Sequence, residues 1–197
     1  MHTLINSIGL RPSEAYIQAD ISEHEKRLQR IRGTGVILID MQRDFVSYSE
    51  ETKRQLQAQE RLLKYSARYD IPVVVLEYVG YGQTLDLLMR TLKKVPRRQF
   101  IGKADDDGFT NSKLVRTLRA WSICNLCLTG VNASACVKET AKGAISVGFS
   151  IETADDLIVD PSDWNQGKSA WWFASEGKWH ASHQDLINFY EYGQIQE

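Results

Sequence analysis

Short apolar segments alternate with longer amphipathic segments along most of this chain, and this alternation is the feature that most constrains its fold. Apolar runs occur at residues 35–40 (GVILID), 71–79 (IPVVVLEYV) and 122–130 (SICNLCLTG). Continuous apolar runs of this length are typical of strands that are buried on both faces. Between the first two runs, residues 49–69 carry leucines among charged residues, as an amphipathic helix does. Buried strands that alternate with helices predict a mostly parallel sheet with helices on both faces.

We therefore predict an α/β protein with three αβα layers, in which a Rossmann-like, mostly parallel sheet has about six strands. A chain of 197 residues fits one compact domain. Residues 1–32 are polar and charged and include the helical pattern SEHEKRLQR. We expect an N-terminal helical arm over residues 1–32 and the main domain over residues 33–197.

The charge balance and the cysteine content indicate which binding partners and which cellular compartment to expect. Lysine and arginine (24) nearly balance aspartate and glutamate (25), which gives no electrostatic reason to expect nucleic acid or an acidic membrane surface. No apolar run approaches the roughly 20 residues that cross a bilayer, and the N-terminus lacks a signal-peptide pattern. Three cysteines make a disulfide framework improbable, so we expect a protein of the reducing cytoplasm.

Three side chains capable of chemistry are expected at one edge of this sheet. Asp40 ends the first apolar run, Lys103 follows a short strand, and Cys136 follows another strand. Ligands in parallel α/β sheets bind beyond the carboxyl ends of the strands. These residues could therefore meet at one site although they are far apart in the sequence.

Each of the three residues also has a purely structural interpretation. A helix N-terminus at Cys136 would favour the thiolate and could hold an oxyanion, but free cysteines are often simply buried in a core. Asp40 could accept the thiol proton if partly desolvated, or could cap the segment that follows. Lys103 could favour a thiolate, or could be a solvated lysine neutralised by the acidic turn ADDD at residues 104–107, which we interpret as solvated.

Three segments together resemble the isochorismatase-like cysteine hydrolases, which include nicotinamidases and N-carbamoylsarcosine amidases. VILIDMQRDF (36–45) is similar to the first strand of that family, and FIGKADDDGFTNSKLVRTL (100–118) to its segment with the catalytic lysine. LCLTGVNASACVKETAKGAISVGFSIETADD (126–156) is similar to the segment with the nucleophile. The order and approximate spacing match over about residues 35–160, which is some two thirds of the chain.

The resemblance implies a hydrolase that cleaves a C–N amide or ureido bond of a small molecule through a thioester. Asp40 takes the position of the general base, Lys103 that of the catalytic lysine and Cys136 that of the nucleophile. It also implies a cis peptide bond between Val131 and Asn132. That bond would direct the N–H of Asn132, with the N–H of Cys136, into an oxyanion hole.

The resemblance further implies that Phe45 and Phe109 contact the substrate, that no cofactor is needed, and that the chain forms a homodimer or a larger homo-oligomer. Nicotinamidases bind a metal through aspartate and histidine residues beyond the second strand. Here residues 76–88 read LEYVGYGQTLDLL and contain no histidine, so we expect no such metal. Residues 167–186 (GKSAWWFASEGKWHASHQDL) match no family pattern; their aromatic residues are a candidate contact surface.

Two other functions remain open at this point. Hydrolysis of a vinyl ether, as in isochorismatases, would need acid–base work from Asp40 but no thiol, and the presence of Cys136 argues against it. A binding or interaction protein could use the same scaffold with an idle triad and the tryptophan-rich C-terminal segment as its contact surface.

Overall fold

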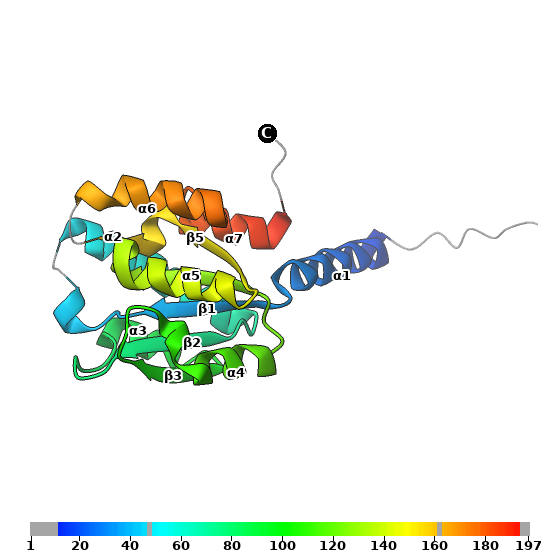
Figure 1. Ribbon diagram of the computed structural model, residues 1–197. Helices are drawn as coiled ribbons and strands as arrows, with labels where there is room; N and C mark the ends of the chain where they lie inside the picture. The colour runs from blue at the N-terminus through cyan, green and yellow to red at the C-terminus, as the bar shows by residue number, and fades with distance from the viewer. Residues whose placement is uncertain (1–11, 47–48, 161–162, 194–197) are drawn as a thin grey trace, which may run out of the picture.

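The computed structural model describes residues 12–46, 49–160 and 163–193, and in this part of the chain it confirms the predicted α/β fold (Figure 1). Seven strands of the described residues form one parallel sheet in the order β3-β2-β1-β4-β5-β7, with β6 paired to β4. The strands are β1 (Thr34–Ile39), β2 (Val73–Tyr78), β3 (Arg98–Lys103), β4 (Asn125–Val131), β5 (Ser150–Ala154), β6 (Ile158–Val159) and β7 (Lys178–His180). The helices are α1 (Pro12–Ile31), α2 (Glu50–Arg68), α3 (Asp86–Leu92), α4 (Ser112–Ala120), α5 (Lys138–Ser146), α6 (Asp163–Glu176) and α7 (His183–Tyr192).

The sheet has a hydrophobic core on each face, because successive side chains of a strand point in opposite directions. Val36 and Leu38 of β1 belong to a buried cluster that includes residues of α2, α3 and α7. Ile37 and Ile39 of the same strand belong to a second cluster with residues of α4, α5 and α6. Figure 1 shows α4 and α5 in front of the sheet and α2 behind it. Burial on both faces explains why the central strands read as continuous apolar runs.

Helix α1 precedes the sheet and projects to one side of it (Figure 1). Its last turns contact α7: Arg30 Nε donates to the carbonyl oxygen of Tyr190 at 2.9 Å, and Arg27 Nε lies 2.5 Å from Glu191 Oε2. Residues 12–31 of the predicted arm form this helix, and residues 1–11 of the arm lie outside the described residues. Among the described residues, no helix combines the length and the apolar character needed to span a membrane.

The strand order changes direction between β1 and β4, and this change positions the site. From β1 the chain passes outward to β2 and β3, and then returns to β4 on the other side of β1. Loops that diverge at such a switch point leave a crevice at the carboxyl ends of the strands. The two strands approach closely here: Gly130 is paired with Ile39, its φ is +140°, and a Cβ would lie 2.1 Å from the Ile39 carbonyl oxygen.

Candidate active site

Asp40, Lys103 and Cys136 lie together at the carboxyl ends of β1, β3 and β4. Lys103 Nζ is 2.8 Å from Asp40 Oδ2, and both side chains are almost completely buried. Asp40 and Cys136 line a cavity of about 270 Å³ at the switch point. The structure thus brings together three residues that are separated by 63 and 33 positions in the sequence (103 − 40 and 136 − 103).

Asp40 directly follows β1 and turns the chain with a positive φ of 52°, a conformation that aspartate tolerates better than most residues. Burial raises the pKa of its carboxyl group, while the Lys103 cation opposes this rise. Neither carboxylate oxygen has a hydrogen-bond donor with suitable geometry among the described residues. The contact with Lys103 is therefore described as an ion pair, on the basis of the 2.8 Å separation of the two atoms. A buried carboxylate with unsatisfied lone pairs can accept a proton.

Lys103 is the last residue of β3, and its side chain has no solvent exposure. Besides the ion pair with Asp40, its Nζ donates to the carbonyl oxygen of Asp105 at 3.0 Å and lies 4.3 Å from the centre of the Tyr78 ring. A buried ammonium group needs such partners, because its desolvation is costly. The three contacts fix the charge of Lys103 next to the carboxylate rather than in solvent.

Cys136 lies in a π-helical turn, η3 (Ala133–Val137), that continues directly into α5. Its Sγ donates to Asp106 Oδ1 at 3.2 Å. Burial, followed by the nearby Asp40 carboxylate, raises the pKa of the Cys136 thiol to about 12. Burial and two carboxylates thus disfavour the thiolate in the free protein, which is the opposite of the effect that a helix N-terminus would have.

The loop between β4 and η3 forms another wall of the cavity. The peptide bond between Val131 and Asn132 is cis, and both residues line the cavity. Asn132 Oδ1 is buried and has no hydrogen-bond partner among the described residues. The loop is anchored by Asp160, whose Oδ1 accepts hydrogen bonds from the backbone N–H and the hydroxyl group of Ser134, both at 2.8 Å.

The two phenylalanines expected to contact substrate lie in different places. Phe45 lines the cavity, and its ring centre is 4.7 Å from that of Tyr81 and 6.0 Å from that of Tyr78. Phe109 does not line the cavity; its ring packs against Phe149 at 5.8 Å on the face covered by α4 and α5. Sequence position alone did not separate a phenylalanine at the cavity from one that packs beside it.

The acidic turn at residues 104–107 is solvent-exposed at Ala104, Asp105 and Asp106, as the sequence predicts, and it also makes specific contacts. The backbone of Asp105 accepts the hydrogen bond of Lys103, and the Asp107 side chain accepts from the N–H of Phe109 at 2.8 Å. Asp106 lines the cavity and contacts Cys136. The sequence ADDD does not show which of its three aspartates contacts the cavity, because identical side chains in a turn point in different directions.

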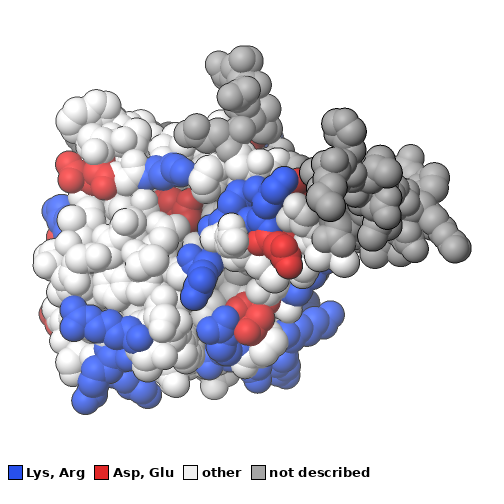
Figure 2. Space-filling model, turned by 90° about the vertical axis from the view of Figure 1, so that its right-hand side faces the viewer, with Lys and Arg blue, Asp and Glu red and all other residues white. Residues whose placement is uncertain are grey.

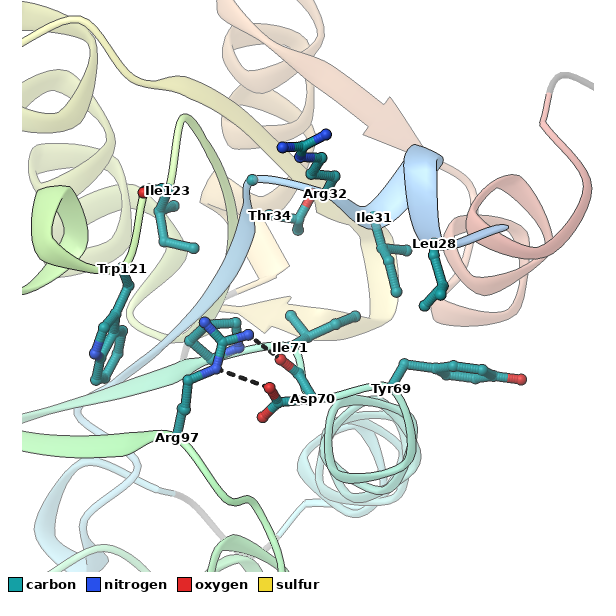
Figure 3. Close-up of a pocket in the computed structure, with 13 residues that line it drawn as sticks. Leu28, Ile31, Arg32, Thr34, Tyr69, Asp70, Ile71, Arg97, Trp121 and Ile123 are labelled. Carbon is teal, nitrogen blue, oxygen red and sulfur yellow. Dashed lines mark hydrogen bonds and ion pairs between the residues drawn. The ribbon is translucent and has the colours of Figure 1, made fainter. Parts of the chain in front are cut away.

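A second pocket, of about 320 Å³, lies at the opposite edge of the sheet, where the amino ends of the strands are (Figure 3). Its lining includes Trp121, Tyr69 and an ion pair in which Arg97 Nε lies 3.0 Å from Asp70 Oδ2. Figure 2 views the molecule from the side where α1 projects and shows Lys and Arg interspersed with Asp and Glu there. This face therefore presents no unbroken basic surface. None of the predicted catalytic residues lines this second pocket.

A metal site is not evident in the part of the chain that the structure describes. No group of three or more histidine, cysteine, aspartate or glutamate side chains there is arranged to hold a metal ion. His180 and His183 have separate carboxylate neighbours: His180 Nε2 lies 3.3 Å from Glu152 Oε2, and His183 Nδ1 lies 2.5 Å from Asp156 Oδ2.

Comparison with known proteins agrees with this architecture. Residues 34–184 match the isochorismatase domain, and the chain belongs to the isochorismatase family, a family of hydrolases with amidase relatives. A streptothricin hydrolase from Streptomyces noursei is 28% identical over 131 residues, which are 61% of this chain and 48% of that protein. The chain thus spans about half the length of this curated relative.

Solved structures share the fold at low sequence identity. The MAR1 ribonuclease from Caenorhabditis elegans has a TM-score of 0.71 at 19% identity over 79% of this chain and 80% of its own. The nicotinamidase from Staphylococcus aureus has a TM-score of 0.68 at 18% identity over 75% of this chain and 99% of its own. The YcaC gene product from Escherichia coli is an octameric hydrolase of unknown specificity. It has a TM-score of 0.68 at 16% identity over 83% of this chain and 79% of its own. At these identities the likeness establishes the fold.

Proposed function

We propose that this protein is a cysteine-dependent hydrolase that cleaves a C–N amide or ureido bond of a small molecule through a thioester intermediate. The observation that carries the proposal is a thiol and a carboxylate with a raised pKa at one cavity, with a buried ammonium group paired to that carboxylate. A cavity of about 270 Å³ suits a small ligand. The nicotinamidase relative is an amidase by name, which supports the same class of bond.

In the proposed first step, Asp40 accepts the proton of the Cys136 thiol as the sulfur attacks the substrate carbonyl carbon. Burial raises the pKa of Asp40 and therefore makes its carboxylate a stronger base. Because the thiol pKa is raised to about 12, the proton leaves as the carbon–sulfur bond forms rather than in the resting protein. The Lys103 cation stabilises the negative charge that develops beside it.

The carbonyl oxygen becomes an oxyanion in this step, and we assign its stabilisation to the backbone N–H groups of Asn132 and Cys136. Both residues line the cavity, on the two sides of the turn that follows β4. Donors fixed by the backbone act strongly because they need no reorganisation during the reaction. The C–N bond then breaks, and protonated Asp40 gives its proton to the departing ammonia or amine.

Hydrolysis of the thioester completes the cycle. Asp40, again a carboxylate, takes a proton from water as the oxygen attacks the thioester carbon. The carbon–sulfur bond then breaks, the acid product leaves, and the sulfur recovers the proton from Asp40. General acid–base help of this kind typically contributes about 10²–10⁴-fold to the rate.

The test is turnover of a panel of small amides and ureido compounds, followed by ammonia release and by mass spectrometry of Cys136. We expect an acyl adduct on Cys136 and no amide turnover in Cys136→Ala, whereas Cys124→Ala, which changes an exposed cysteine, keeps activity. Unchanged turnover in Cys136→Ala would refute the nucleophile. Cleavage of isochorismate by Cys136→Ser, or cleavage of RNA without amide turnover, would assign the site to another reaction.

We further propose that the chain assembles into a homodimer or a larger homo-oligomer. Trp171 of α6 is 74% exposed and offers an aromatic side chain of the kind that is enriched at protein–protein interfaces. An octamer occurs in the YcaC relative of the same fold. Light scattering coupled to size exclusion tests the proposal: a monomeric mass at micromolar concentration contradicts it, and Trp171→Lys should reduce the mass of an assembly that uses this face.

A further inference from the structure

The cavity beside Cys136 has an aromatic wall and a separate carboxylate. The wall consists of Phe45, Tyr78 and Tyr81, whose ring centres lie 4.7–6.0 Å from one another. Tyr81 is 44% exposed, so its ring stands at the mouth rather than in the core. The carboxylate of Asp106 lines the same cavity, next to the sulfur of Cys136.

The charges around the cavity do not balance. Asp40 is paired with Lys103, and this pair is neutral. Asp106 forms no ion pair with any lysine, arginine or histidine among the described residues, and its contact there is the hydrogen bond from Cys136. The cavity therefore has an excess negative charge beside aromatic rings, which is the combination that attracts an organic cation.

The position of Asp106 is fixed by its backbone. Its carbonyl oxygen accepts a hydrogen bond from Thr140 Oγ1 at 3.1 Å, and the same hydroxyl oxygen accepts from the N–H of Gly108 at 3.0 Å. Tyr78 Oη donates to the carbonyl oxygen of Ala104 at 2.7 Å on the other side of the turn. Thr140 lies on α5, the helix that directly follows the turn with Cys136, so the backbone of Asp106 is anchored close to the sulfur.

We propose that the substrate carries an ammonium, amidinium or guanidinium group, which pairs with Asp106 beside the aromatic wall while the scissile carbonyl lies against Cys136. This inference rests on the proposed amide or ureido hydrolase and names the charge of its substrate. Asp106 Oδ1 is only 3.2 Å from the sulfur, so the cation must lie within a few bonds of the carbonyl. Asp106 is a specificity-determining residue in this arrangement.

Binding of such a cation would also prepare the nucleophile. The hydrogen bond to Asp106 is one of the contacts that raise the pKa of Cys136. A bound cation withdraws the Asp106 carboxylate from this contact and offsets its charge. The thiol then loses its proton to Asp40 more readily when a cationic substrate is present than when the cavity is empty.

Asp106 has one competing role, because a carboxylate in contact with the thiol could itself be the general base. The two roles differ in their dependence on substrate charge. Loss of a base slows cationic and neutral substrates equally, whereas loss of a cation partner slows only the cationic ones. Substrate pairs that replace an ammonium group by a methyl group of similar size separate them.

The first experiment measures kcat/KM for β-alaninamide against butyramide, and for 4-aminobutyramide against pentanamide, at pH 7.5. We expect the wild type to prefer the cation of each pair, and Asp106→Asn to lower that preference by about 10- to 100-fold. Asp44→Asn removes an exposed carboxylate that precedes Phe45 in the sequence and does not line the cavity, and should leave the preference unchanged. An equal loss for both members of a pair, or a preference for the methyl compound, overturns the inference.

The second experiment does not depend on the choice of substrate. In a Cys124→Ser background, Cys136 is modified with methanethiosulfonate reagents that carry a trimethylammonium, an ethyl or a sulfonate group. We expect the cationic reagent to modify Cys136 fastest, the neutral reagent more slowly and the anionic reagent slowest. In Asp106→Asn, the three rates should become similar. Modification rates that do not depend on the charge of the reagent overturn the inference even if amide turnover is found. Absence of any Cys136-dependent turnover, with the charge order intact, instead counts against the proposed function.

Discussion

Lys103 Nζ lies 2.8 Å from Asp40 Oδ2, and neither side chain is more than 2% exposed. A buried ion pair is energetically costly, because both charges must be removed from water. The pair stands at the carboxyl ends of two strands, β1 and β3, which are separated in the sheet by β2. Its presence away from solvent is more easily explained by chemistry than by stability, since apolar residues of similar size would pack as well.

The first prediction concerns the stability of this pair. Lys103→Met leaves Asp40 buried without its cation, and we expect a loss of about 3–5 kcal/mol in the free energy of unfolding at pH 7.5. Asp40→Asn leaves the ammonium unpaired and should also destabilise. The double variant should lose much less than the sum of the single losses, because no uncompensated charge remains. Urea denaturation of all four proteins measures this coupling, and additive losses would contradict it.

The pH dependence of the Lys103→Met loss follows from the raised pKa of Asp40. A carboxyl group with a folded-state pKa above its ordinary value of 3.8 binds a proton more tightly in the folded protein. Stability therefore falls as the pH rises from 3.8 through the raised pKa, and Lys103→Met raises that pKa further. We expect the deficit of the variant to shrink when the denaturation is repeated at pH 4.5. A deficit that grows on acidification would show that the charge of Asp40 is not its cause.

The second prediction concerns the reactivity of Cys136. Because burial and Asp40 raise its pKa to about 12, alkylation by iodoacetamide in a Cys124→Ser background should accelerate with pH up to pH 10 without a plateau. Asp40→Asn removes the second of these causes, so we expect alkylation at pH 8 to become about 10-fold faster, the effect of one pKa unit. Amide hydrolysis should be lost in the same variant. Asp86→Asn, an exposed aspartate of α3, is the matched control. A plateau below pH 9 in the wild type would contradict the raised pKa.

The sequence predicted the centre of the fold better than its edges, for a physical reason. The central strands β1, β2 and β4 are buried on both faces and therefore appear as apolar runs. In contrast, β6 has two residues and β7 has three, too few to show any periodicity. Their place in the sheet depends on contacts with β4 and β5 that no local pattern records.

The same distinction applies to the candidate site. Asp40, Lys103 and Cys136 could be placed at one edge because each follows a predicted strand. The direction of the Asp106 side chain could not be predicted, because it depends on the hydrogen bond between its backbone and Thr140, 34 residues later. The raised pKa of Cys136 likewise depends on burial and on carboxylates from other segments, and the sequence around it indicated the opposite shift.

The third prediction concerns the C-terminal helix, whose role the sequence left open. Tyr190 of α7 is buried, and its Oη donates to Glu152 Oε1 at 2.7 Å. Tyr190→Phe removes this hydrogen bond to a buried carboxylate and should cost about 1.5–3 kcal/mol of unfolding free energy. Tyr192→Phe, on a side chain that is 68% exposed, should cost almost nothing. Neither residue lines the cavity, so kcat/KM should not change; equal stabilities of the two variants would contradict the contact.

The fourth prediction concerns the close approach of β1 and β4 beneath the site. At Gly130, φ is +140° and a Cβ would lie 2.1 Å from the carbonyl oxygen of Ile39, so a side chain forces the two strands apart. Backbone strain and overpacking together should cost roughly 3–5 kcal/mol in Gly130→Ala. Gly148→Ala separates the two effects, because Gly148 also has a positive φ, +91°, but open space around its would-be Cβ. We expect it to lose only about 1–2 kcal/mol.

The same pair of variants tests whether this contact positions the chemistry. Ile39 precedes Asp40, and Gly130 precedes the Val131–Asn132 bond, so separation of the strands moves a carboxylate away from the proposed oxyanion site. We expect the folded fraction of Gly130→Ala, measured at low temperature, to hydrolyse amides at least about 10-fold more slowly, since small displacements of positioned groups have large effects on rate. Gly148→Ala should retain full activity per folded molecule. Equal activity of the two variants would show that the spacing of these strands does not set the geometry of the site.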